Sequence, residues 1–230
     1  MLPHPFASMI TYARLAKQGC DLILAGRNPA RLNALSTRSR GHVSSMLCAA
    51  AFLLWTTPGS GDDLQIDANS FPCITKMTPV RQFYVDNLRG NLDATLAAAN
   101  STTGAAYPPG SVLQLIPGEA MVKRDKGFNT ETLDWEFFEL DVSKDGTKIR
   151  KRGAADVVNR FGGNCFGCHA PAGAQWDLVC ETDHGCAPLP VTRAMIRALQ
   201  RTDPRCNNPT ISPEDAEALK QLEQVLKPPG

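Results

Sequence analysis

The stretch Cys165-Phe-Gly-Cys-His169 constrains this chain more than any other, because it puts two thiols and an imidazole within five positions. Two cysteines three residues apart, followed directly by a histidine, are typical of the attachment site of a c-type haem. In such a site Cys165 and Cys168 hold the porphyrin through thioether bonds, and His169 binds the iron. The sequence therefore predicts one covalent haem c.

The same residues allow two other interpretations. A C-x-x-C pair can be a redox-active dithiol. A tetrahedral zinc site is the second alternative, and its ligands would come from four cysteines and two histidines: Cys165, Cys168, His169, Cys180, His184 and Cys186. Zinc would make the chain a stapled binding module, but it needs reduced thiols, which an exported protein does not readily keep. Haem attachment is therefore the favoured interpretation.

Residues 1–45 do not match the rest of the chain. The segment from Tyr12 to Leu35 has the pattern of a helix end, a buried strand and a helix start, and it resembles the second strand region of short-chain dehydrogenases. The Gly-rich phosphate loop that would precede this strand is missing, so the segment predicts no dinucleotide site. We interpret residues 1–45 as a non-functional extension or a misassigned start.

A short apolar run follows at residues 46–61. Basic residues precede the part from Met46 to Trp55, and small residues follow it. This pattern, well below the roughly 20 residues of a membrane span, is typical of a secretory signal, and a buried core helix is the alternative. We therefore expect a signal peptide over residues 46–61 and a mature haem domain over residues 62–230. That domain would be periplasmic or secreted, without a membrane span.

The remaining cysteines fit an oxidising compartment. If the leader is removed and two cysteines carry haem, four are left: Cys73, Cys180, Cys186 and Cys206. Four cysteines can form two disulfides in three pairings. A bridge between Cys180 and Cys186 would close a short loop, and one between Cys73 and Cys206 would join the two ends of the domain. The sequence does not choose between the pairings.

Composition and hydrophobic pattern together predict the fold class. The formal net charge is +1 over 230 residues, so nothing indicates a nucleic-acid binder or a membrane-surface protein. Strands are expected over residues 80–86, 111–116, 120–123, 133–142 and 147–150, and helices over residues 87–100, 154–161, 191–200 and 212–226. This order predicts an α+β fold, an antiparallel β-sheet with packed helices, with haem attached near a C-terminal helical or loop region.

Three stretches occur in an order that resembles the cytochrome P-460 family, which also contains the cytochromes c′-beta. They are Tyr107-Pro-Pro-Gly110 before a strand, Trp135-Glu-Phe-Phe138 on the next long strand, and the haem motif near the end. The similarity covers residues 80–172, less than half of the chain. It implies an exported, sheet-rich haem c protein, often a homodimer, whose five-coordinate iron is open on its distal side.

The resemblance also implies what the haem does. Some members bind nitric oxide or carbon monoxide, and others oxidise hydroxylamine with a lysine cross-linked to the haem edge. Leu115 lies at about that lysine's position here, and Lys123, the nearest substitute, is expected to be a solvated charge at a strand end. We therefore expect electron transfer to a redox partner protein or small-gas binding at the iron. A redox enzyme acting on hydroxylamine or another small nitrogen compound is the alternative.

The strongest strand carries the residues expected nearest the iron. Alternation sends Phe137 and Phe138 to opposite faces of the sheet, so one of them, and not both, can cap the haem. An apolar cap gives no hydrogen bond to bound oxygen, which favours nitric oxide or carbon monoxide. An electron carrier would instead have a protein group as the sixth iron ligand. The candidates for that ligand are Met77, Met121, His184 and Met195.

Overall fold

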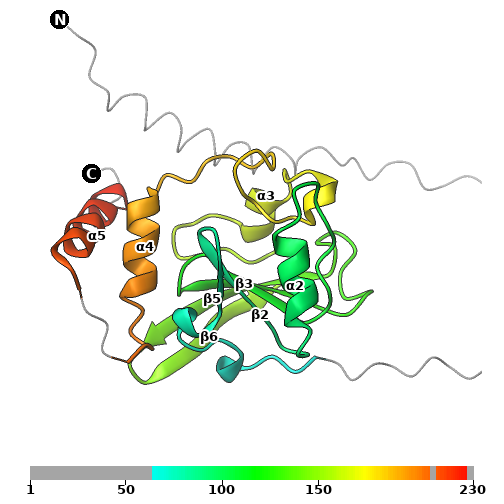
Figure 1. The fold of residues 1–230 in the computed structure, drawn as a ribbon, viewed down its shortest axis with the longest axis horizontal. Coiled ribbons are helices and arrows are strands. Elements are labelled where there is room, and N and C mark those ends of the chain that lie inside the picture. Colours follow the sequence, from blue (N-terminus) through cyan, green and yellow to red (C-terminus); the bar gives the residue numbers. More distant parts are fainter. Residues whose placement is uncertain (1–63, 208–210, 227–230) are drawn as a thin grey trace, which may run out of the picture.

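The structure, a computed structural model, describes residues 64–207 and 211–226. At its centre lies a six-stranded antiparallel sheet in which each strand pairs with the next one along the chain (Figure 1). The strands are β1 (Thr78–Val80), β2 (Phe83–Asn87), β3 (Ser111–Gln114), β4 (Glu119–Lys123), β5 (Trp135–Ser143) and β6 (Gly146–Gly153). The predicted α+β fold with an antiparallel sheet is confirmed.

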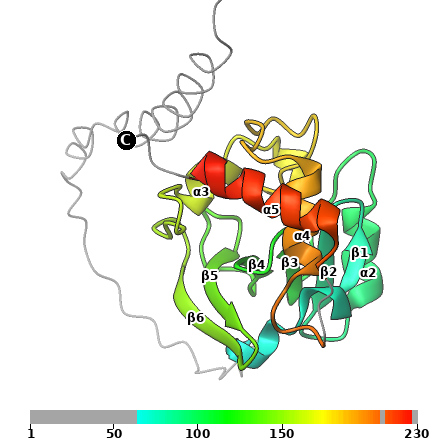
Figure 2. The same ribbon diagram turned by 90° about the vertical axis from the view of Figure 1, so that its left-hand side faces the viewer.

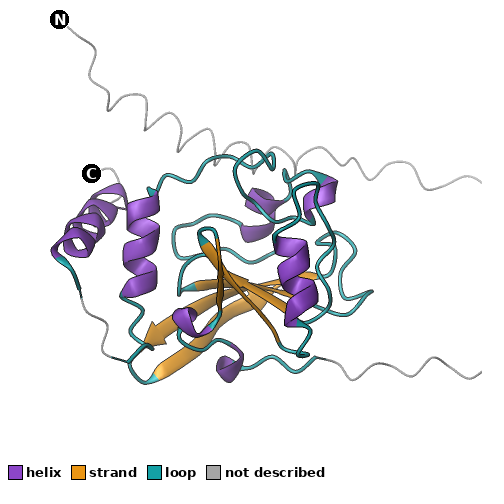
Figure 3. Ribbon diagram, in the orientation of Figure 1, coloured by secondary structure: helices purple, strands orange, loops and turns teal. Residues whose placement is uncertain are grey.

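Each face of the sheet buries its own apolar cluster. One face packs against α2 (Leu92–Ala99) and against the haem motif, which forms α3 (Cys165–His169), and we call it the motif face. The opposite face packs against residues 64–77, which include the short 3-10 helices η1 (Ala68–Ser70) and η2 (Ile74–Lys76). Figure 1 shows α2 and α3 on the same side of the strands, and Figure 3 shows that much of the chain around α3 is loop.

Strands β4 and β5 show the alternation that their sequence predicted. Their register pairs Met121 with Phe137 and Ala120 with Phe138. Met121 and Phe137 belong to the cluster on the motif face. Ala120 and Phe138 belong to the opposite cluster, where Phe138 packs on Phe71 with ring centroids 4.9 Å apart. The two phenylalanines therefore lie on opposite faces of the sheet.

Two helices near the C-terminal end pack on each other (Figure 2). α4 (Arg193–Arg201) begins after Thr192, and α5 (Pro213–Leu226) begins after Ser212. The hydroxyls of Thr192 and Ser212 both accept a hydrogen bond from a backbone N–H of the first turn, which stabilises a helix start. Both predicted helices are confirmed. In the described part of the chain, no helix is long and apolar enough to cross a membrane.

Two disulfides settle the pairing that the sequence left open. Cys73 and Cys206 join the start of the described domain to the loop after α4, across a sequence separation of 133. Cys180 and Cys186 close a short loop beyond the haem motif. The cysteines of the haem motif remain thiols.

Turns divide or shorten two of the predicted strands. The single strand expected over residues 80–86 is two strands, because the chain turns at Arg81, whose φ is +50°. The Arg81 guanidinium binds Glu181, 100 residues away, at 2.8 Å. The strand expected from Leu133 begins at Trp135, because Leu133 has a φ of +49° and is exposed. A contact distant in sequence therefore holds the turn at Arg81.

The helix predicted over residues 154–161 was wrong. This segment consists of turns and one isolated bridge between Val158 and Asn164. The side-chain oxygen of Asn159 accepts hydrogen bonds from the Phe161 and Gly163 N–H groups, at 3.1 and 2.9 Å. Such local bonds from an asparagine compete with the helical pattern.

Candidate functional site

The haem motif forms one short helix that the flanking chain fixes in place. The side-chain oxygen of Asn164 caps α3 by accepting a hydrogen bond from the Gly167 N–H at 2.6 Å. The Cys165 N–H donates to the Val157 carbonyl at 2.9 Å. Because residues three and four apart share one side of a helix, both thiols and the His169 imidazole project from the same side of α3.

The surroundings of His169 determine its tautomer. Its Nδ1 lies 2.7 Å from the carbonyl oxygen of Leu178. A carbonyl only accepts hydrogen bonds, so Nδ1 carries the proton. Burial lowers the pKa of the imidazole, and the bond to Leu178 partly opposes this. The ring is therefore neutral with its lone pair on Nε2, which is the form that binds a metal.

The His169 ring lies against the motif face of the sheet. Its centroid is 5.3 Å from that of Phe137, and the planes are tilted by 53°. Phe137 is 2% exposed and has no polar atom in its side chain. Four predicted site residues thus lie together: Cys165, Cys168, His169 and Phe137. Phe138 does not join them, because it packs on the opposite face.

Burial controls the chemistry of Cys165. Its side chain packs against the cluster on the motif face. Burial, and then the charges of Glu119 and Glu139, raise the pKa of the thiol to about 12. A redox-active dithiol needs a lowered thiol pKa, so this environment does not favour that interpretation. A thiol in an apolar site suits an uncharged thioether.

Two acidic side chains near Cys165 were not indicated by the motif. Glu119 on β4 pairs directly with Glu139 on β5, so the two side chains are neighbours on the motif face. Burial, and then the charge of Glu139, raise the pKa of Glu119 to about 7. Glu139 is fully buried and accepts a hydrogen bond from the Arg160 guanidinium at 2.6 Å. The signal in the sequence is alternation, since Glu119 shares a strand face with Met121.

Lys123 is buried, and its expected place as a solvated charge was wrong. Its side chain lies on the motif face with the residue 8% exposed. The Nζ donates to both carboxylate oxygens of Asp177, at 2.7 and 2.8 Å, and to the Leu133 carbonyl at 2.7 Å. These contacts account for all three protons of the ammonium group.

Asp177 connects the sheet to the residue that binds His169. Its carboxylate also accepts from the Tyr107 N–H at 2.8 Å. Its backbone carbonyl accepts from the Trp135 indole N–H at 2.7 Å. The next residue is Leu178, whose carbonyl binds the imidazole. The sheet and the candidate iron ligand are therefore linked through two consecutive residues, Asp177 bonded to the sheet and Leu178 bonded to His169.

A disulfide-closed loop supports the chain beyond the motif. The Gly173 N–H donates to the His184 carbonyl at 2.8 Å. The His184 ring stacks on Trp176 with centroids 3.8 Å apart. Because the sulfurs of Cys180 and Cys186 are bonded to each other, they supply no thiolate for zinc. The zinc interpretation thereby loses two of its ligands.

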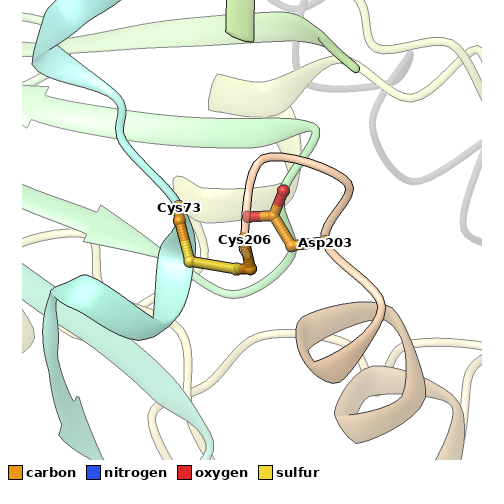
Figure 4. Close-up of side chains that lie close together, drawn as sticks. All are labelled: Cys73, Asp203 and Cys206. Atoms are coloured by element: carbon orange, nitrogen blue, oxygen red, sulfur yellow. A yellow bond between two sulfur atoms is a disulfide. The ribbon is translucent and has the colours of Figure 1, made fainter. Parts of the chain in front are cut away.

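One group of side chains in the described residues has the composition of a metal site: Cys73, Asp203 and Cys206. Figure 4 shows the two sulfurs bonded to each other, with the carboxylate beside them. Asp203 accepts from the Ile74 N–H at 2.9 Å and pairs with Arg205 at 2.6 Å. These bonds make the group a structural link between the two ends of the domain.

The four candidates for a sixth iron ligand lie in different environments. Met77 packs in the cluster of the opposite face. Met195 lies in α4, where its sulfur is 3.4 Å from a backbone N–H, and the His184 Nδ1 is 2.7 Å from a backbone carbonyl. Met121 is buried on the motif face, paired with Phe137. Of these four, Met121 is the one that shares a sheet face with Phe137.

Comparison with known proteins gives no match, since no family model, curated protein or solved structure matches the chain. The resemblance to the cytochrome P-460 family and the haem cofactor therefore stay predictions from the sequence. The expected leader and the dehydrogenase-like segment fall in residues 1–63, outside the described part of the chain.

Proposed function

We propose that this chain is an exported c-type haem protein that binds a small gaseous ligand, nitric oxide or carbon monoxide, at its iron. In this proposal Cys165 and Cys168 tether one haem and His169 binds the iron. The observation that carries the proposal is the hydrogen bond from His169 Nδ1 to the Leu178 carbonyl. It leaves Nε2 unprotonated on the same helix side as the two thiols.

The donor set fits a covalent haem. When bound, haem supplies an iron centre that takes diatomic ligands and exchanges single electrons. Attachment needs two thiols and a neutral imidazole at this spacing. Four of the described cysteines are in disulfides, so Cys165 and Cys168 are the described cysteines that can form thioethers.

The side chains of the motif face favour a gas binder over an oxygen-activating enzyme. Leu113, Met121 and Phe137 are buried there and offer no hydrogen-bond donor. The ammonium group of Lys123 is engaged by Asp177. Because polarity and donors near the iron govern oxygen activation, a diatomic ligand beside these three side chains would be contacted without a hydrogen bond, whereas the carboxyl groups of Glu119 and Glu139 lie near Cys165 on the same face.

Electron transfer is the second candidate, and the position of Met121 favours it. Met121 is buried beside Phe137 on the motif face. If the Met121 thioether were to bind the iron together with His169, no position would be left for a gas, and the thioether ligand would raise the reduction potential. The protein would then pass electrons to a redox partner protein.

The alternative of hydroxylamine oxidation gains no support from the described residues. It would need a lysine free to bond to the haem edge. Leu115, at about the expected position, is a partly buried apolar residue packed against the motif-face cluster, and Lys123 is already held by three hydrogen bonds. An enzymatic role is therefore not part of the proposal.

Two disulfides support the proposed compartment. Such bonds persist in oxidising environments, which include the periplasm and the cell exterior. Haem of the c type is attached there, as the resemblance to the P-460 family implies. The proposal that this protein forms a homodimer rests on the resemblance to that family alone.

Absorption spectra of the exported protein test the proposal. The reduced form should shift when carbon monoxide is added, because the sixth position is open. A reduced spectrum that carbon monoxide leaves unchanged, together with a sulfur-to-iron charge-transfer band in the oxidised form, would contradict gas binding. That result would support the electron-transfer function. Met121 would then be the first residue to substitute, to test whether it is the second iron ligand.

A further inference from the structure

We infer that the buried ion pair of Lys123 and Asp177 positions the axial histidine and thereby tunes the iron. The inference rests on the proposed attachment of haem at His169 and deepens it. Neither residue belongs to the haem motif, and the pattern of the motif does not indicate Asp177 at all.

The ion pair of Lys123 and Asp177 is buried and held by several hydrogen bonds. Lys123 and Asp177 are 8% and 4% exposed, and Lys123 is the last residue of β4, an inner strand of the sheet. Asp177 receives two bonds from Lys123, one from the Tyr107 N–H and, at its carbonyl, one from the Trp135 indole. A residue held from three different segments has little freedom to rotate.

The backbone after Asp177 follows an unfavourable path. Asp177 and Leu178 have φ values of +50° and +64°. Residues with a Cβ atom rarely adopt this left-handed conformation, and two in succession persist when surrounding contacts impose it. The contacts to Asp177 are those that impose it here. This path leads directly to the Leu178 carbonyl that lies 2.7 Å from His169 Nδ1.

The hydrogen bond to Leu178 links the position of His169 to its strength as an iron ligand. A histidine that donates its second ring proton to a fixed acceptor is held in orientation and becomes a more basic ligand. A more basic imidazole favours oxidised iron and lowers the reduction potential. Loosening Asp177 should let Leu178 relax, weaken this bond and raise the potential.

Paired variants separate positioning from simple stability. Asp177→Asn keeps the size and the hydrogen-bond acceptor but removes the charge. The matched control is Asp203→Asn, because Asp203 is also buried in an ion pair, with Arg205, and it binds the Ile74 N–H of η2 on the opposite face of the sheet. Both variants should lose stability. In the haem-loaded, full-length protein, Asp177→Asn should raise the reduction potential and lower the iron–histidine stretching frequency of the ferrous form, whereas Asp203→Asn should change neither.

The outcomes are distinguishable. Parent protein without covalent haem would overturn the proposed function and this inference with it. Parent protein with haem, and a potential in Asp177→Asn equal to that of the parent, would overturn the inference alone. Lys123→Gln removes the same ion pair by changing its cationic partner. If Asp177→Asn does not fold, the reduction potential of Lys123→Gln tests the inference in its place.

A further measurement needs no variant. In the diamagnetic ferrous complex with carbon monoxide, the Nδ1 proton of His169 should give a proton resonance that exchanges slowly with D2O. Slow exchange is expected because a fixed carbonyl holds the proton. An Nδ1 proton that exchanges as fast as that of an exposed histidine would overturn the inference without any substitution.

Discussion

Phe137 packs directly on the ring of His169, with centroids 5.3 Å apart. The neighbouring residue, Phe138, packs on Phe71 on the other face of the same sheet. Strand β5 therefore connects the candidate iron ligand to the hydrophobic core. The two adjacent aromatic residues form a natural pair for experiment, because they have the same size and nearly the same exposure.

Phe137→Leu should make ligand binding faster. The smaller side chain opens the apolar surface beside His169, so carbon monoxide should reach the reduced iron more quickly while haem content stays the same. Flash photolysis of the carbon monoxide complex measures this rate. The matched control is Phe138→Leu, which should cost a similar amount of stability, about 1–3 kcal/mol, with an unchanged rate. Equal rates in both variants would show that Phe137 does not border the ligand path.

The two disulfides should have different roles. Replacing Cys73 and Cys206 by serine opens a link across 133 positions. In the chain-entropy model this lowers the free energy of unfolding by about 5 kcal/mol, with the haem spectrum unchanged. Replacing Cys180 and Cys186 opens a separation of 6 and costs only about 2 kcal/mol, but the spectrum should change because this loop supports the chain next to Leu178. Denaturant titration and absorption spectra separate the two effects.

Glu119 should make stability depend on pH. Its pKa is raised to about 7 in the folded protein, against about 4.3 for an unfolded chain. Between these values the folded state holds a proton that the unfolded state has lost, so stability should fall as pH rises through this window. Glu119→Gln should flatten this slope, and Glu131→Gln, at an exposed position, should keep it. Thermal unfolding measured from pH 4 to 8 checks the prediction, which fails if Glu119→Gln retains the full slope.

Much of the fold could be predicted because the pattern was local. The alternation in β5, the hairpin before β6 and the capped starts of α4 and α5 depend on neighbouring residues. The turn at Arg81 and the irregular segment at residues 154–161 could not be predicted. Arg81 is held by Glu181, and Asn159 bonds to the N–H groups of a glycine-rich turn, so distant or side-chain contacts overrode the apparent pattern.

Part of the candidate site could be predicted from the sequence. Cys165, Cys168 and His169 stand together in the chain, and alternation separated Phe137 from Phe138. The acceptor at Leu178 could not be predicted, because a backbone carbonyl has no signature in sequence. Lys123 was expected at the surface because its partner, the Asp177 carboxylate, lies 54 positions away in the sequence.

The proposed leader gives a prediction for the N-terminus. A signal peptide over residues 46–61 implies that the exported protein begins between about Thr56 and Leu64. Leu64 is buried against the sheet, so cleavage should spare it. N-terminal sequencing of exported material checks this. A sequence that begins at Met1 would contradict the leader and reopen the dehydrogenase-like segment.

Mass spectrometry of the exported protein after acid and organic extraction shows whether haem is attached covalently. The polypeptide should carry the mass of one haem, because thioethers to Cys165 and Cys168 survive denaturation. Serine at either cysteine should weaken retention, and His169→Ala should keep the tether but alter the spectrum. A polypeptide of unmodified mass, with haem in the organic phase or no haem at all, would contradict the account.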